Sequence, residues 1–220
     1  VPDTRIALGR IANGERHRIG MKVVGVTGSV GKSTTKEMIS TVLETTFRTA
    51  KTPANHNNDI GMPMGILSMP EDTQVAVLEM GMNHFREMGY LSAIGQPDVA
   101  VIVNIGTMHI EHLGSQEGIL QAKLEILEGM EATAPVLLNG DDKFLKTADC
   151  GMHPVRFFGV GENCAVRGLD PEISTGCVSF RVKAGDREFP IELPVEGEHF
   201  VCDALAAVAV GLELGVEPVK

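Results

Sequence analysis

The sequence is poor in aromatic residues and in positive charge. Among its 220 residues it contains no Trp and a single Tyr, and its formal net charge is −10. Proteins that hold single-stranded nucleic acid need aromatic surfaces on which bases stack. General binding to nucleic acid or to an anionic membrane also needs a basic surface. We therefore expect no nucleic-acid partner, although a local basic pocket for a phosphate is compatible with this composition.

Long apolar runs and paired cysteine motifs are missing as well. No stretch of about 18 apolar residues and no signal-peptide pattern occurs, so no membrane insertion is predicted. The four cysteines form no CxxC pattern and are typical of the reduced thiols of a cytoplasmic protein. Apolar residues still make up 43% of the chain, which is enough to bury a core. We expect a globular protein in the cytoplasm.

Short apolar runs alternate with segments of helical periodicity. Strands are expected at residues 22–26, 74–80, 98–104, 135–139 and 155–160, and helices at 33–47, 86–94, 115–130 and 202–215. Continuous Val, Ile and Leu runs between helices indicate a parallel sheet that is covered on both faces. After residue 163, turn signals separate further strands, which predict antiparallel pairing. The predicted fold is α/β, with a mostly parallel P-loop-type sheet, helices on both faces and a small antiparallel extension.

The segment from Thr27 to Met38, "TGSVGKSTTKEM", is similar to a phosphate-binding loop. It misses the pattern G-x-x-x-x-G-K-[ST] by one glycine, because Val26 occupies the first position. A strand still leads into a glycine-rich turn and then into a helix, whose free N–H groups and dipole favour an anion. Lys32 is placed to reach the outer phosphates, and Ser33 to bind Mg²⁺. The context favours a nucleotide site over a simple glycine turn.

Other polar residues follow the expected strands and should share the same edge of the sheet. Glu79 suits Mg²⁺, but a solvated glutamate at a strand end fits equally well. His109 is a weaker candidate, because His112 follows three residues later and either could be structural. Lys123 falls on the apolar stripe of its helix, where spacing favours a snorkelling stem over a functional lysine. The loop 52–63 is either a turn-rich connection or a second polar wall of the cleft.

Taken together, these segments resemble the Mur ligase family of ATP-dependent amide-bond-forming enzymes. The motifs "TGSVGKSTTKEM", "NHNNDIGMPM", "LEMGMNH", "NIGTMHIEHLGS" and "QAKLEIL" occur in the family's order and span nearly the whole chain. The resemblance implies a role in peptidoglycan precursor synthesis, with UDP-MurNAc-tripeptide and D-Ala-D-Ala as substrates and ATP and Mg²⁺ as cofactors. ATP would phosphorylate the tripeptide carboxylate, and the amino group of the dipeptide would attack the acyl phosphate.

The resemblance also implies a domain organisation. Residues 1–20 would be the tail of a missing N-terminal substrate domain, and residues 21–220 the central ATPase domain, with the C-terminal domain absent. Much of the binding of UDP and of the dipeptide would then depend on missing parts. We expect little or no ligation from the isolated chain, and a monomer.

The site residues implied by the resemblance fall into three groups. Nucleotide binding is assigned to Gly28, Ser29, Gly31, Lys32, Ser33, Thr34, Asn55, Asn58 and His199. Ser33 and Glu79 would bind a first Mg²⁺, and His109 a second. Lys123 matches the family lysine that is carbamylated, and as a carbamate it would join the metal ligands. Lys32, His109 and Lys123 form the catalytic group.

The chain departs from the family pattern at two places. Phe200 and Asp203 replace the two asparagines of "G-x-H-N-x-x-N-A-L-A-A", so the adenine contact of that helix is put in question. Arg86 replaces the glycine of "N-H-x-G-E". Neither change touches the residues assigned to the phosphates or to the metal.

Three alternatives remain open at the level of sequence. Another Mur-like ligase, of the folylpolyglutamate or cyanophycin synthetase type, would share the phosphate loop and the metal-binding histidine. A P-loop kinase or GTPase-like protein needs a Walker-B aspartate or an N-K-x-D base reader, whereas this chain has Glu79 and no N-K-x-D. A binding module without chemistry is disfavoured by the complete set of candidate catalytic residues.

Overall fold

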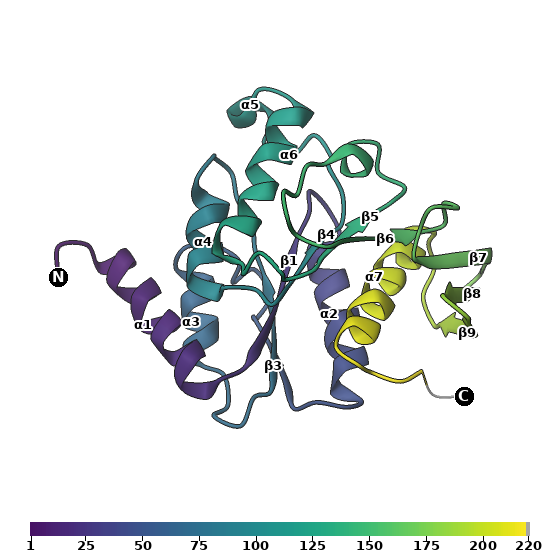
Figure 1. The fold of residues 1–220 in the computed structure, drawn as a ribbon, viewed down its shortest axis with the longest axis horizontal. Helices are drawn as coiled ribbons and strands as arrows, with labels where there is room; N and C mark the ends of the chain where they lie inside the picture. The colour runs from purple at the N-terminus through teal and green to yellow at the C-terminus, as the bar shows by residue number, and fades with distance from the viewer. Residues whose placement is uncertain (219–220) are drawn as a thin grey trace.

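The strands of this computed structural model, which describes residues 1–218, form one nine-stranded sheet in the order β2-β3-β1-β4-β5-β6-β7-β8-β9. Neighbours from β2 to β7 pair in parallel, and β7–β8 and β8–β9 pair antiparallel. The predicted α/β fold class is confirmed, with its antiparallel extension at one end of the sheet (Figure 1). The strands are β1 (Lys22–Thr27), β2 (Thr49–Lys51), β3 (Val75–Glu79), β4 (Val99–Ile102), β5 (Val136–Asn139), β6 (Val155–Gly159), β7 (Val166–Ser174), β8 (Cys177–Ala184) and β9 (Arg187–Leu193).

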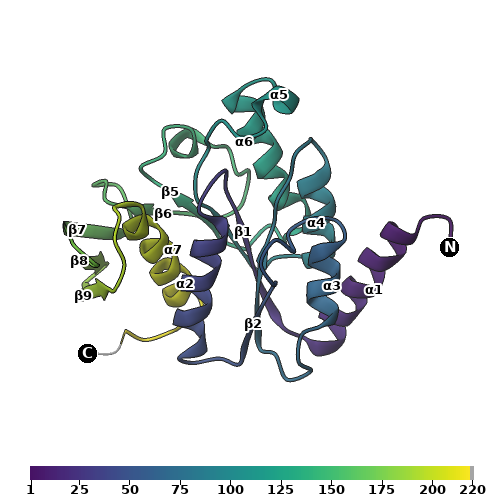
Figure 2. The same ribbon diagram turned by 180° about the vertical axis from the view of Figure 1, so that it is seen from behind.

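Helices cover both faces of the parallel part of the sheet. One layer contains α1, α3, α4 and α6, and the other contains α2 and α7 (Figures 1 and 2). The α-helices are α1 (Thr4–Ile19), α2 (Lys32–Glu44), α3 (Gly61–Leu67), α4 (Glu87–Gly95), α5 (Ile110–Leu113), α6 (Gln116–Leu124) and α7 (His199–Glu213). Two short 3₁₀ helices are η1 (Glu125–Gly129) and η2 (Leu145–Thr147). None of these helices is long and apolar enough to cross a membrane.

The continuous apolar character of the strands follows from this double cover. Successive side chains of a strand point to opposite faces of a sheet. Val23 accordingly belongs to the core under α1, α3, α4 and α6, while Val24 and Val26 belong to the core under α2 and α7. The helix predicted at 33–47 packs on the sheet through an apolar face, on which Ile39 and Leu43 are fully buried.

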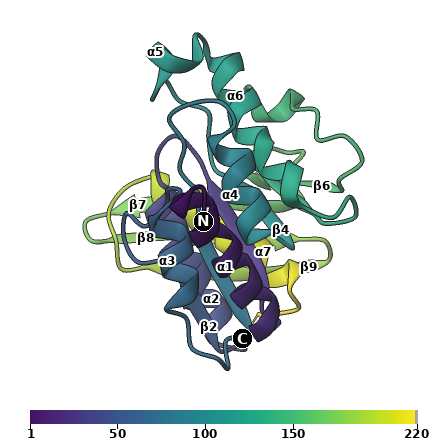
Figure 3. The same ribbon diagram turned by 90° about the vertical axis from the view of Figure 1, so that its left-hand side faces the viewer.

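The N-terminal segment is a helix that the sequence pattern did not predict. Asp3 caps α1 by accepting hydrogen bonds from two backbone N–H groups, and Gly20 ends it in the left-handed conformation. Only Gly9 and Ala12 of this helix are buried, so no apolar stripe marks it. Arg16 fixes it to the loop before β4, donating to the carbonyl of Gln96 and to the carboxylate of Asp98. Figure 3 views the molecule from the side on which α1 lies.

Several smaller elements also differ from the expectation. The strand β2 and the helices α3 and α5 were not predicted, because three to seven residues are too few to show a period. The helix expected at 115–130 is α6 followed by η1, and Ser115 caps α6 by accepting from Gly118 N. The antiparallel pairing predicted after residue 163 is confirmed for β7 with β8 and for β8 with β9, and β7 joins this extension to the rest of the sheet by pairing in parallel with β6. The last two residues of the predicted ATPase domain, 219 and 220, lie outside the described residues.

Candidate active site

The carboxyl ends of three adjacent strands bring the candidate residues together. Strand β1 lies between β3 and β4, with Val26 opposite Glu79 and Thr27 opposite Ile102. The phosphate loop, the carboxylate at the end of β3 and the loop after β4 therefore meet at one edge. This is the edge at which open α/β sheets bind ligands.

The phosphate loop runs directly into the N-terminus of α2. Gly31 occupies the N-cap position with φ 83°, a left-handed conformation that glycine adopts without steric cost. Lys32 Nζ donates to the carbonyl oxygens of Gly28 at 2.9 Å and of Ser29 at 3.2 Å. Burial lowers the pKa of Lys32, and the nearby carboxylate of Glu79 partly offsets this effect. The ammonium group thus lies inside its own loop, where an anion would be held.

Glu79 is the buried carboxylate next to this loop, with 2% of its surface exposed. Its Oε2 accepts from Ser33 Oγ at 2.8 Å, and its Oε1 accepts from Asn57 Nδ2 at 2.9 Å. Its backbone N–H donates to Thr52 Oγ1. A hydroxyl and a carboxylate oxygen at this separation suit Mg²⁺, which prefers oxygen ligands and takes the rest from water and phosphate. The pair predicted to bind the first Mg²⁺ is therefore in contact.

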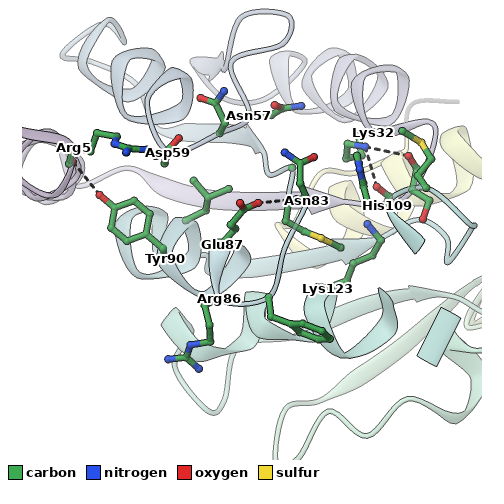
Figure 4. Close-up of a pocket in the computed structure, with 18 residues that line it drawn as sticks. Arg5, Lys32, Asn57, Asp59, Asn83, Arg86, Glu87, Tyr90, His109 and Lys123 are labelled. Atoms are coloured by element: carbon green, nitrogen blue, oxygen red, sulfur yellow. Dashed lines mark hydrogen bonds and ion pairs between the residues drawn. The ribbon is translucent and has the colours of Figure 1, made fainter. Parts of the chain in front are cut away.

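A cavity of about 590 Å³ opens in front of the phosphate loop. Lys32, His109 and Lys123 gather at one end of it, and Arg5, Asp59 and Tyr90 lie at the other (Figure 4). At that far end Arg5 pairs with Asp59 at 3.0 Å, and Tyr90 Oη donates to the carbonyl of Arg5. The cavity is long enough to extend from the nucleotide loop to the helix α1.

Lys123 does not snorkel, because only 3% of its surface is exposed. Burial and the nearby charge of Lys32 lower its pKa to about 7. Among residues 1–218, no hydrogen bond or ion pair engages its Nζ. A buried amine that is about half neutral at pH 7 is a nucleophile, and groups with such perturbed pKa values concentrate at functional sites.

His109 has a left-handed backbone conformation, with φ 64°. This conformation is uncommon for a residue other than glycine, and such outliers concentrate at functional sites. The residue occupies the N-cap position of the short helix α5 and lines the cavity. Within residues 1–218, no three His, Cys, Asp or Glu side chains are grouped closely enough to hold a metal ion by themselves.

The other predicted nucleotide-binding residues are divided between the cavity and its surroundings. Gly28, Ser29 and Asn58 line the cavity; Gly31, Thr34, Asn55 and His199 do not. Asn58 Oδ1 accepts from Ile60 N and Gly61 N and so holds the turn that leads into α3. His199 is exposed at the start of α7, and its ring packs against Phe200 at a centroid distance of 4.2 Å. Asn57, which the sequence analysis did not assign, is the asparagine of this loop that binds Glu79.

Asn104 is a further residue that the sequence analysis did not assign to the site. Its Oδ1 accepts from the backbone N–H groups of Ser29 and Val30, each at 3.0 Å, and its Nδ2 donates to the Val30 carbonyl at 2.9 Å. Gly106 N donates to Ser29 Oγ from the same loop. The segment after β4 therefore fixes the shape of the phosphate loop. The signal that could have revealed Asn104 is its position as the polar residue that ends the apolar run expected as a strand at 98–104.

We expect Asn104→Ala to weaken binding of an ATP analogue by roughly tenfold, because three hydrogen bonds that shape the phosphate loop are lost. Calorimetry with Mg²⁺ measures the change. Asn139→Ala is the matched control, since Asn139 ends β5 and its side chain accepts from Asp141 N, within its own loop. Equal affinities of the two variants would contradict a bracing role for Asn104.

Asp203, one of the departures from the family pattern, lies against the phosphate loop. It is 3% exposed, and its Oδ1 accepts from Thr35 Oγ1 at 2.6 Å. A methyl group added to Gly31 would meet the same oxygen at 3.3 Å. Burial raises the pKa of Asp203, and the hydrogen bond from Thr35 partly counteracts this effect. A buried carboxylate at this point opposes the charge of a bound phosphate.

We expect Asp203→Asn to raise the free energy of unfolding at pH 7 by about 1 kcal/mol. The variant should also bind an ATP analogue more tightly than the wild type. Because the folded-state pKa is raised, the wild type loses stability as pH rises from 3.8 through that pKa, whereas the amide does not titrate. Thermal unfolding at pH 4 and pH 7 measures the difference. The gain should be larger at pH 7, and a gain only at pH 4 would contradict this assignment.

Arg86, the other departure, occupies a position shaped for glycine. Its φ is 73°, and its backbone N–H donates to both carboxylate oxygens of Glu125. Its guanidinium pairs with Glu128 at 3.3 Å and points away from Lys32 and His109 (Figure 4). The substitution leaves the phosphate end of the cavity unchanged.

The fold and the site together define a nucleotide-binding α/β domain of the P-loop type. A family model described as the Mur ligase middle domain matches residues 26–211, and the chain belongs to the Mur ligase family. The chain is 42% identical over 219 residues to the UDP-N-acetylmuramoyl-tripeptide–D-alanyl-D-alanine ligase of Bacillus subtilis, covering 99% of this chain and 47% of that protein. It thus spans about half the length of the curated relatives it matches.

Two solved structures have the same fold. A MurF crystal structure from Acinetobacter baumannii has a TM-score of 0.93 and 38% identity, covering 99% of this chain and 48% of that one. The MurF ligase of Thermotoga maritima in complex with ADP has a TM-score of 0.92 and 30% identity, covering 100% of this chain and 51% of that one. These similarities do not favour the folylpolyglutamate, cyanophycin, kinase or GTPase alternatives.

Proposed function

We propose that this chain is the central ATP- and Mg²⁺-binding part of an ADP-forming ligase that adds D-Ala-D-Ala to UDP-MurNAc-tripeptide. The observation that carries the proposal is the cavity in which Lys32 and Lys123 meet beside the Ser33–Glu79 pair. The names of the similar proteins supply the substrates. Residues 1–20 fit the tail of a substrate domain and residues 21–220 the ATPase domain. A reaction that consumes ATP fits a cytoplasmic protein.

The phosphate end of the cavity suits activation of a carboxylate. A carboxylate oxygen is a poor leaving group, so transfer of the γ-phosphoryl group must first convert it to an acyl phosphate. Lys32 would leave the carbonyls of Gly28 and Ser29 and donate to the outer phosphates, while the N–H groups at the start of α2 hold the others. Bound Mg²⁺ would neutralise phosphate charge at Ser33, Glu79 and His109.

Attack by the amino group of the dipeptide then forms the amide and releases phosphate. The groups around the cavity have to exclude water at this step, because water would hydrolyse the acyl phosphate. The dipeptide amine must lose a proton to become the new amide nitrogen. The acidic side chains that line the cavity, Asp59 and Glu87, lie away from Lys32 and Lys123 (Figure 4), so the proton has to be accepted by another group at the phosphate end, such as His109.

The structure supports carbamylation of Lys123. The reaction needs the neutral amine, whose nitrogen bonds to the carbon of CO₂ and then loses a proton. A pKa of about 7 leaves about half of the side chain neutral at pH 7, against very little for an exposed lysine. The carbamate replaces a buried cation by an anion, which suits a site lined by Lys32 and able to hold Mg²⁺.

The test uses the complete gene product that carries this sequence. With ATP, Mg²⁺, UDP-MurNAc-tripeptide and D-Ala-D-Ala we expect ADP and the pentapeptide product in equal amounts, measured by mass spectrometry. The 220-residue chain alone is expected to show little or no ligation. ADP formation that requires glutamate and a folate instead, or robust ligation by the chain alone, would contradict the proposal.

A further inference from the structure

Lys36 is a fully buried lysine that takes part in no step of the proposed reaction. It lies one turn after Lys32 on α2, and none of its surface is exposed. Its Nζ donates to the Thr52 carbonyl at 2.9 Å and to Glu79 Oε2 at 3.4 Å. Glu37 Oε1 lies at 3.7 Å, but the carboxylate of Glu37 is exposed and is held more closely by Lys51 at 2.6 Å. The buried partner of Lys36 is therefore Glu79.

Both carboxylate oxygens of Glu79 thus accept hydrogen bonds from neighbouring side chains. Oε2 accepts hydrogen bonds from Ser33 Oγ and Lys36 Nζ, and Oε1 accepts one from Asn57 Nδ2. Thr52 holds both members of the ion pair, since its carbonyl accepts from Lys36 and its hydroxyl accepts from Glu79 N. The ammonium group is consequently fixed beside the oxygen that would bind a metal.

A divalent cation that arrives alone would meet this fixed positive charge at short range. The two side chains of the pair are 1% and 3% exposed, so water screens the repulsion poorly. A cation that arrives with a triphosphate brings an excess of negative charge, which compensates the ammonium group. The arrangement therefore distinguishes free metal from metal bound to nucleotide.

We propose that Lys36 is a resident counter-ion of Glu79, which keeps the site from taking up free divalent cation and admits Mg²⁺ only together with a nucleotide. This inference rests on the proposed function. Lys36 acts through Glu79 and touches no reacting atom, so it is a positioning residue.

The test measures binding of Mn²⁺ to the chain in the absence of nucleotide, by electron paramagnetic resonance. We expect weak binding by the wild type and a gain of at least about tenfold in Lys36→Met, which removes the charge and keeps an unbranched side chain one atom shorter. Lys36→Arg keeps the charge and should bind as weakly as the wild type. The double variant Lys36→Met, Glu79→Gln should lose the gain, which locates the new binding at Glu79.

Two results would overturn the inference. One is a folded Lys36→Met variant, checked by circular dichroism, whose affinity for free Mn²⁺ is no higher than that of the wild type. The other needs no Lys36 variant: wild-type binding of free Mn²⁺ with a Kd below about 0.1 mM that Glu79→Gln abolishes. A purely structural role for Lys36 predicts altered thermal stability with unchanged metal affinity.

A separate measurement distinguishes failure of this inference from failure of the proposed function. If the wild-type chain and the complete gene product bind no ATP analogue with Mg²⁺, both proposals fall. If they bind the analogue and Lys36→Met gains no affinity for free Mn²⁺, only the role of Lys36 is contradicted.

Discussion

Lys32→Ala is expected to weaken Mg²⁺-dependent binding of an ATP analogue by roughly a hundredfold. The ammonium group of Lys32 donates to the carbonyls of Gly28 and Ser29. Burial lowers its pKa, and the nearby carboxylate of Glu79 offsets only part of this effect. A phosphate oxygen offers a full negative charge in place of two neutral carbonyls, so the gain on binding is large. Alanine removes that gain and leaves the backbone of the loop intact.

Calorimetric titration of the 220-residue chain, with and without Mg²⁺, measures this effect. Lys22→Ala is the control, because it makes the same change of charge at the opposite end of β1, where Lys22 is exposed. Unchanged affinity in Lys32→Ala would mean that the nucleotide binds elsewhere. Failure of the wild type to bind would leave two explanations, the lack of parts outside this chain or the loss of the adenine contact at Phe200 and Asp203. The same titration on the complete gene product decides between them.

The second large effect is expected for Lys123→Met, which should raise the stability of the chain and lower its activity. Removing a buried amine of lowered pKa should raise the free energy of unfolding at pH 7 by about 2 to 4 kcal/mol when CO₂ is excluded. The same change should lower ligation by the complete gene product at least about a hundredfold, because it removes the proposed carbamate. A variant that is more stable but inactive would show that Lys123 lowers the stability of the fold and is retained for activity.

The stability difference between Lys123→Met and the wild type should depend on pH. The pKa of Lys123 falls from 10.5 to about 7 on folding. Between pH 7 and pH 10.5 the unfolded chain therefore binds more protons than the folded chain, and the stability of the wild type rises with pH through this window. The advantage of Lys123→Met should be full below pH 7 and should vanish near pH 10.5.

Thermal unfolding at pH 6.5, 8 and 10 follows the stability, with degassed buffer to prevent carbamylation. Lys183→Met is the control, because Lys183 is exposed on β8 and its loss should change stability little at any pH. Added bicarbonate should stabilise the wild type and leave Lys123→Met unchanged. A Lys123→Met variant that is less stable than the wild type at pH 6.5 would contradict the description of Lys123 as an uncompensated buried amine.

The fold and part of the site were accessible from the sequence because their causes are local. A strand, a glycine-rich turn and a helix N-terminus form the phosphate loop within one continuous segment, so Lys32 and Ser33 could be identified from neighbouring residues. Glu79 could be placed because the ends of parallel strands meet at one edge, and its register opposite Val26 agrees with that rule. The helix α1 was not predicted from the sequence, because only two of its residues are buried and no apolar stripe marks it. Its stability comes from a cap and from contacts with the rest of the chain.

The sequence by itself determined the class of fold, the phosphate loop and the edge of the sheet at which the site lies. Tertiary structure alone decided which side chains meet there. It selected Asn57 from an asparagine-rich loop to bind Glu79, buried Lys123 beside Lys32, and joined Thr35 to Asp203 across 168 residues. Spacing along a chain gives the face on which a side chain lies, whereas burial and charge depend on the elements that pack against that face.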